Sequence, residues 1–132
     1  MIVIDASALV KYILKEQGWE KVEEHLHQSD SLELIQLEAT NAIWKNYYLK
    51  RITKKDSIKG FQVLEALCEK VLTLHESRVY LDEAFKYSIQ EKVPIYDVLY
   101  IMLAMNESAI LVTSDKKQAK LASKLGIKVK SV

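Results

Sequence analysis

Four acidic residues of this chain stand where a carboxylate could do chemistry. Asp5 directly follows an apolar run (MIVID), and Asp115 follows a second one (ILVTSD) near the other end. Glu38 and Asp97 lie beside long apolar stretches, where an acid is less expected than on a wet helix face. If the four carboxylates converge, their repulsion is severe without a cation. Carboxylate oxygens suit Mg²⁺ or Mn²⁺ and not zinc, so the pattern indicates a site for one of those ions.

A structural explanation competes with this one for each acid. Asp5 or Ser7 could cap a first helix, and Asp115 could cap the last, because acids favour helix N-termini. Asp97 is harder to explain in this way, since the VLYIMLAM that follows it is apolar enough to require burial. Both explanations remain open at this point.

The composition is that of an ordinary globular domain. The 132 residues suffice for a single domain over residues 1–132, and three glycines and one proline argue against disorder and against a turn-rich all-β fold. A formal net charge of +1 gives no overall signature of nucleic-acid binding. The single Cys68 permits no internal disulfide, and no apolar run is long enough for a membrane span. We therefore expect a cytoplasmic protein without membrane contact.

Strand-like and helix-like segments alternate along the chain, which predicts an α/β fold with a largely parallel sheet. Strands are expected within residues 1–4, 31–37, 71–74, 110–113 and 127–132. Helices are expected over residues 7–16, 19–27, 38–51, 54–69, 78–92, 96–106 and 116–125, with Thr53 and Ser77 as N-caps of the fourth and fifth. Ligands of such sheets bind beyond the carboxyl ends of the strands, the edge where Asp5 and Asp115 should lie.

Four stretches of the sequence carry a family resemblance. In chain order they are IVIDASALVKYILKE, LIQLEATNAIWK, VPIYDVLYIMLAMN and ILVTSDKKQAKLASKLGIKV. Together they resemble the PIN domain and, within it, the VapC-type ribonuclease toxins of type II toxin–antitoxin pairs. The resemblance covers essentially the whole chain, although residues 53–92 match by helical pattern and not by motif. It implies a three-layer α/β/α domain with a central sheet of about five strands.

The resemblance also assigns roles to individual residues. It implies that one or two Mg²⁺ or Mn²⁺ ions are held by a catalytic set of Asp5, Glu38, Asp97 and Asp115. Small polar residues that the family often places around the metal match Ser7, Thr113 and Ser114. No histidine lies in a matching stretch, and we interpret His25, His27 and His75 as ordinary surface or interface residues.

The implied activity is metal-dependent endoribonuclease cleavage of RNA phosphodiester bonds. Carboxylates alone would repel the phosphate, so the acids make sense only as a cradle for a metal. Side chains that could contact RNA phosphates are Lys116, Lys117, Lys45 and Arg51. The alternative for these basic residues is an ordinary solvated helix face.

The helix expected at residues 38–51 also indicates a partner. Trp44 and Tyr48 form an apolar stripe beside the core-facing one, which is wider than one buried face requires. By resemblance the partners are a second copy of the chain, forming a homodimer, and a small VapB-like antitoxin. A helix packed on both sides would explain the same pattern.

Other interpretations of the acids remain. A phosphotransferase of the haloacid-dehalogenase kind would need a second aspartate where this chain has Ser7. A receiver-type signalling domain would need an acidic pair at Asp5, although Lys116 partly matches its lysine. A non-catalytic α/β interaction protein, or a PIN scaffold silenced by its partner, is the main alternative, because intact acids show capacity and not activity.

Overall fold

The computed structural model describes residues 1–132, the whole of the printed sequence. Its five strands form one sheet in the order β3-β2-β1-β4-β5, and every neighbouring pair is parallel. The strands are β1 (Ile2–Ile4), β2 (Ser29–Leu32), β3 (Thr73–His75), β4 (Ile110–Thr113) and β5 (Val129–Ser131). The predicted α/β fold with a parallel five-stranded sheet is confirmed.

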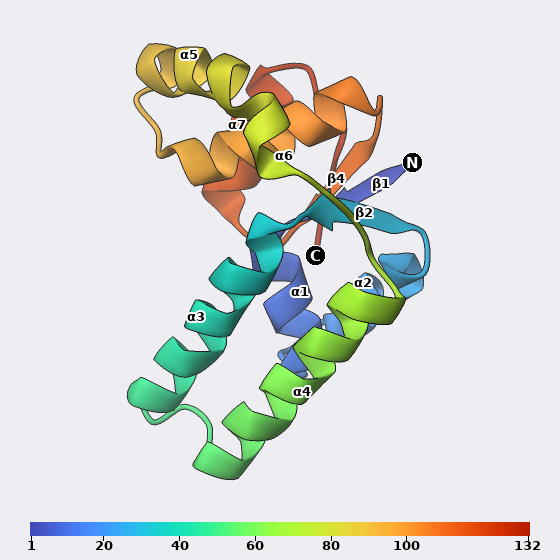
Figure 1. The fold of residues 1–132 in the computed structure, drawn as a ribbon, viewed down its shortest axis with the longest axis vertical. Helices are drawn as coiled ribbons and strands as arrows, with labels where there is room; N and C mark the ends of the chain where they lie inside the picture. The colour runs from blue at the N-terminus through green and yellow to red at the C-terminus, as the bar shows by residue number, and fades with distance from the viewer.

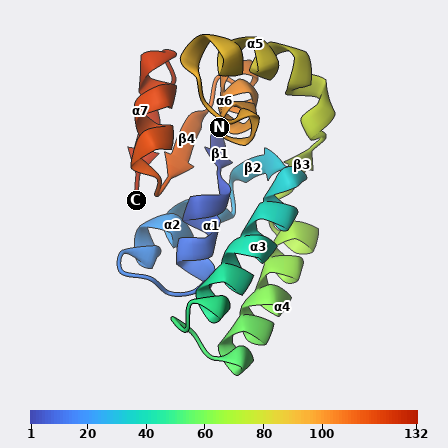
Figure 2. The ribbon, with the colours of Figure 1, turned by 90° about the vertical axis from the view of Figure 1, so that its left-hand side faces the viewer.

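Two layers of helices cover the sheet, as Figures 1 and 2 show. One layer contains α1 (Ala6–Ile13), α2 (Trp19–Leu26), α3 (Leu34–Tyr48) and α4 (Lys54–Lys70). The other contains α5 (Leu81–Glu91), α6 (Ile95–Asn106) and α7 (Lys116–Lys124), with the short 3₁₀ helix η1 (Ser77–Tyr80) leading into α5. None of these helices combines the length and the apolar character needed to cross a lipid bilayer.

The core is built around the central strands and α6. Seven consecutive residues of α6, from Val98 to Ala104, are buried, because α6 lies between the sheet and α5. This explains why its sequence is apolar all round and not on one face only. The helix is therefore held on several sides, and the residues at its two ends have fixed positions.

The sequence placed the start of α3 too late. Residues 31–37 were expected to hold a strand and its connection, but β2 ends at Leu32 and α3 begins at Leu34, so Glu38 lies in the second turn of α3 and not at its start. Ile35, Ala39 and Ile43 are buried at a spacing of four residues, which shows that this apolar run follows the helical period.

Of the two expected N-caps, one forms and the other does not. Thr53 caps α4 through a hydrogen bond from the Asp56 amide, at 3.0 Å. Ser77 does not cap a helix: it is the first residue of η1, and α5 begins only at Leu81. A single 3₁₀ turn therefore replaces the start of the helix expected from residue 78.

Candidate active site

Two of the four acids lie at the ends of neighbouring strands. Asp5 follows β1 and caps α1, and Asp115 lies just beyond β4 and caps α7. Strands β1 and β4 pair in parallel with Ile4 opposite Val112, so both acids reach the same carboxyl edge of the sheet. The topology thus brings together residues from the two ends of the chain.

Helices bring the other two acids to this edge. Asp97 is in the first turn of α6, and its carbonyl oxygen accepts a hydrogen bond from the Gln118 side-chain amide in α7, at 2.8 Å. Glu38 is in α3, which directly follows β2, the other neighbour of β1. We call Asp5, Glu38, Asp97 and Asp115 the acidic cluster.

The charges of the acidic cluster act on one another. The negative charge of Asp115 raises the pKa of both Asp5 and Asp97, after the larger effect of their burial. Burial and then the charge of Asp97 raise the pKa of Glu38. The four carboxylates therefore form one electrostatic unit that favours the binding of protons or cations.

Asp5 lies deepest in this unit. Only 4% of the residue is exposed, and burial raises the pKa of its carboxyl group to about 6. Donors partly offset this effect: the Ser7 hydroxyl at 2.7 Å and the Ala8 amide at 3.0 Å reach Oδ1, and the Thr113 hydroxyl donates to Oδ2. The carboxylate is thus oriented by hydrogen bonds from both α1 and β4.

The acidic cluster is open on the side of Asp115. Glu38 and Asp97 are half-buried, whereas Asp115 is exposed. Asp115 Oδ1 accepts the Lys117 and Gln118 amides at 2.8 and 3.2 Å, which leaves Oδ2 without a hydrogen bond. Helix capping and a role in the cluster are therefore compatible in the same side chain.

The small polar residues singled out from the sequence surround Asp5. The hydroxyl groups of Ser7 and Thr113 both donate to its carboxylate, and their oxygen atoms lie 3.2 Å apart. Ser114 contributes through its main chain, since its amide donates to the Ser7 hydroxyl at 3.0 Å. These contacts fix the loop after β4 against the start of α1.

Two further residues of the site were not found from the sequence. The Tyr100 hydroxyl donates to Glu38 Oε1 at 2.6 Å, and Tyr100 is almost fully buried. Burial and the charges of Glu38, Asp5 and Asp97 raise the pKa of Tyr100, so it stays a neutral donor. Gln118 joins α7 to α6, and its buried Oε1 has no hydrogen-bond partner. Both residues follow an acid of the cluster by three positions, the helical spacing that could have revealed them.

The basic residues proposed from the sequence divide into two groups. Lys116 and Lys117 begin α7 beside Asp115, and the charge of Lys117 partly offsets the rise in the pKa of Asp97 that burial and Asp115 cause. Lys45 and Arg51 lie near or beyond the C-terminal end of α3, which Figure 1 shows projecting away from the sheet. Only the first group lies next to the acidic cluster.

The pKa of Asp5 predicts how the stability of the metal-free chain depends on pH. The folded chain keeps the Asp5 proton up to about pH 6, against an ordinary value of 3.8, so it binds more protons than the unfolded chain between these values. The free energy of unfolding in EDTA should therefore fall as the pH rises from about 4 to 7, by roughly 3 kcal/mol from Asp5. Urea unfolding at a series of pH values measures this.

The matched control for this measurement is Asp5→Asn, which retains the cap acceptor but cannot titrate. Its stability should lose the Asp5 part of the pH dependence while other carboxyl groups contribute as before. Parallel stability curves for wild type and Asp5→Asn would show that the Asp5 carboxyl has an ordinary pKa.

The hydrogen bond between Tyr100 and Glu38 predicts a specific energetic coupling. Tyr100→Phe should lower the free energy of unfolding by about 1–3 kcal/mol, because Glu38 loses a buried donor to its carboxylate. In the background of Glu38→Gln the same substitution should cost less, and a double-mutant cycle measures the difference. Tyr96→Phe, at an exposed position on the same helix, is the control. Equal effects of Tyr100→Phe in both backgrounds would rule out the coupling.

Two known proteins resemble this chain over most of its length. The chain is 29% identical over 123 residues to Ribonuclease VapC3 of Pyrobaculum aerophilum, covering 89% of this chain and 92% of the relative. It is also 29% identical over 115 residues to Exonuclease VapC9 of the same organism, covering 87% and 80%. Both relatives span nearly all of this chain.

Solved structures show the same fold. The crystal structure of PAE2754 from Pyrobaculum aerophilum superposes with a TM-score of 0.74 at 25% identity, covering 97% of this chain and 89% of that one. VapBC2 from Rickettsia felis, bound to a DNA fragment from its promoter, gives 0.64 at 18% identity and covers 99% and 98%. The family description that matches the sequence is "PIN domain", over residues 2–124. Since this match spans nearly the entire sequence, the chain belongs to the PIN-domain family.

Proposed function

We propose that the chain is a metal-dependent endoribonuclease that hydrolyses RNA phosphodiester bonds in the cytoplasm as the toxin of a VapBC-type pair. The observation that carries the proposal is the acidic cluster at the carboxyl edge of a parallel sheet in a PIN domain. The names of the two sequence relatives, a ribonuclease and an exonuclease, support nuclease chemistry. We take residues 1–132 as one catalytic domain.

The donor set of the acidic cluster fits Mg²⁺ or Mn²⁺. It offers carboxylate oxygens only, which these ions prefer, and contains no imidazole or thiolate. Burial and mutual repulsion raise the pKa of Asp5, Glu38 and Asp97. At Asp97 the charge of Lys117 partly offsets this rise. A divalent ion would relieve this excess of negative charge. Asp5, Glu38, Asp97 and Asp115 would hold it.

Each surrounding residue has a definite task in this proposal. A bound divalent ion supplies positive charge for the phosphate and makes a water molecule a better nucleophile. Ser7 and Thr113 orient the Asp5 carboxylate, and Tyr100 orients that of Glu38. Gln118 keeps the first turns of α6 and α7 together, so that Asp97 and Asp115 remain neighbours.

Positive charge near the exposed side of the cluster would attract the substrate. Lys116 and Lys117 lie in the first turn of α7, next to the exposed Asp115, and both are exposed themselves. We propose these two lysines as phosphate contacts. Lys45 and Arg51, at the far end of α3, would contact only an RNA that extends along that helix.

Loss of the acidic charge should abolish cleavage without unfolding the chain. Asp97→Asn should reduce RNA cleavage in Mg²⁺ or Mn²⁺ by at least about 100-fold, because it removes a metal ligand that is not needed for the core. Excess EDTA should abolish the activity of the wild type. Cleavage of a labelled single-stranded RNA measures both effects, and circular dichroism checks the fold.

The substrate form tests the type of nuclease. Cleavage of a circular RNA shows endonuclease action, whereas an exonuclease requires a free end. The control variant is Lys120→Ala, an exposed substitution farther along α7 that should leave activity nearly unchanged. Full activity of Asp97→Asn, or activity that persists in EDTA, would contradict the proposed mechanism. A folded wild type inactive on RNA and DNA would favour the non-catalytic alternative.

Two exposed apolar stripes fit the two proposed protein partners. On α3, Trp44 and Tyr48 are 54% and 66% exposed, and their rings stack with centroids 5.2 Å apart. On α5, Leu81, Phe85 and Ile89 are all exposed at a spacing of four residues. We propose that the α3 stripe binds a small VapB-like antitoxin and that the α5 stripe forms a homodimer, since exposed aromatic and aliphatic patches mark interfaces.

Substitutions in the two stripes should separate the two interactions. Trp44→Ser with Tyr48→Ser should prevent co-purification of a small protein from the native host and leave the dimer intact. Phe85→Ser with Ile89→Ser should give a monomer that still binds that protein. Light scattering after size exclusion measures the mass in each case. A wild type that is monomeric and recovers no partner would contradict both assignments.

A further inference from the structure

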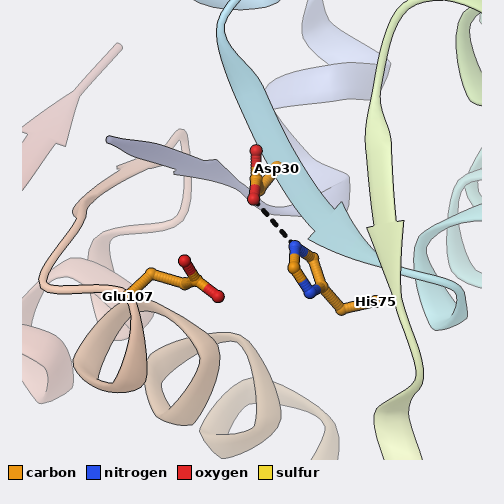
Figure 3. A group of neighbouring side chains, drawn as sticks. All are labelled: Asp30, His75 and Glu107. Carbon is orange, nitrogen blue, oxygen red and sulfur yellow. Dashed lines mark hydrogen bonds and ion pairs between the residues drawn. The ribbon is translucent and has the colours of Figure 1, made fainter.

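A second group of potential metal ligands lies outside the acidic cluster. Asp30, His75 and Glu107 bring their carboxylate oxygens and imidazole nitrogen within 4.8 Å of one another. Figure 3 shows Asp30 on β2, His75 on β3 and Glu107 at the end of α6, all pointing into the same space. We call these residues the Asp–His–Glu cluster. No other three His, Cys, Asp or Glu side chains approach this closely.

The main chain holds each of these residues in place. Asp30 lies on β2, which pairs with β1 on one side and β3 on the other. His75 ends β3, and its carbonyl oxygen accepts the Glu33 amide at 2.9 Å. Glu107 is the C-cap of α6, where the Ala109 amide binds the Ala104 carbonyl at 2.8 Å and Ser108 adopts a positive φ of 51°. The hydrogen bond from Ala109 and the left-handed conformation of Ser108 close this end of the helix, so the backbone of Glu107 has little freedom.

The Asp–His–Glu cluster has more negative than positive charge. His75 Nε2 lies 2.7 Å from Asp30 Oδ2, and this contact is the one polar side-chain interaction that either residue makes. The other ion pair of the structure joins Lys124 and Glu91, so no lysine or arginine neutralises Asp30 or Glu107. Two partly buried carboxylates thus face a single imidazole. A cation between them would neutralise charge that the protein leaves unbalanced.

The mixed donor set distinguishes this group from the acidic cluster. An imidazole nitrogen suits Zn²⁺ and related transition-metal ions, whereas Mg²⁺ prefers oxygen ligands alone. Three protein ligands leave positions for water, as in many zinc sites with an open coordination position. Asp97 and Glu107 are ten residues apart along α6, so these two positions lie about 15 Å apart along the helix axis.

We propose that Asp30, His75 and Glu107 form a binding site for a divalent transition-metal ion of the zinc class, separate from the proposed catalytic centre. The ion takes the place of the proton shared by His75 Nε2 and Asp30 Oδ2, which is released to water, and it is also bound by the Glu107 carboxylate. It links β2, β3 and the end of α6. Its role is to fasten the short edge strand β3 to the core.

Binding of Zn²⁺ alone to the purified full chain tests the proposal. Calorimetric titration in excess Mg²⁺, which occupies an oxygen-only site, should detect one Zn²⁺ per chain. His75→Ala and Glu107→Gln should each weaken this binding at least about tenfold, the smallest loss typical even of residues that only support metal ligands. Glu107→Gln keeps the test valid if His75→Ala does not fold, because the Glu107 side chain makes no hydrogen bond within the protein.

Two control variants exclude other binding sites. His27→Ala removes an exposed imidazole at the end of α2 and should leave Zn²⁺ affinity unchanged. Asp97→Asn alters the acidic cluster and should also leave it unchanged, so failure of the proposed nuclease activity would not affect this result. Undiminished Zn²⁺ affinity in both His75→Ala and Glu107→Gln, or loss of Zn²⁺ binding in Asp97→Asn, would overturn the proposal.

Discussion

The burial of a single carboxylate, that of Asp5, constrains the rest of the site. Its removal from water is the largest cause of its raised pKa, and the chain compensates with donors from α1 and from the end of β4. Thr113 and Ser7 are 106 residues apart in sequence, yet both must be in place for Asp5 to be oriented. The site therefore forms only when β1 and β4 have paired, because the donors that orient Asp5 come from α1 and from the end of β4.

Helix α6 contributes one acid to the acidic cluster and one to the Asp–His–Glu cluster. Its buried middle fixes it against the sheet, and each end presents an acid: Asp97 in the first turn and Glu107 at the cap. Asp97 belongs to the acidic cluster, which offers oxygen donors only, and Glu107 belongs to the Asp–His–Glu cluster, which includes an imidazole. A displacement of α6 along its axis would therefore change both groups at once, although they lie at opposite ends.

The strand-following acids could be predicted from the sequence because their position depends on local order. Asp5 and Asp115 each follow an apolar run, and a parallel sheet places such residues at one edge. The start of α3 was misplaced because the short segment SLELIQL, with apolar residues at 32, 34, 35 and 37, fits both the strand and the helix period. The hydrogen-bond partners of Tyr100 and His75 could not be predicted, because they depend on tertiary packing, of α6 against α3 for Tyr100 and of β3 beside β2 for His75. The helical spacing from Asp97 indicates only the side of α6 on which Tyr100 lies.

The brevity of the two outer strands limits how copies of this chain can meet. Edge strands β3 and β5 have three residues each, and β5 carries an exposed lysine, Lys130, at its centre. Short edges with a charged residue offer few free main-chain groups for another strand, a common protection against aggregation. Continuation of the sheet from one molecule into the next is thus disfavoured. Any association of copies would therefore depend on side-chain surfaces, where side-chain identity and not backbone pairing determines which partner is accepted.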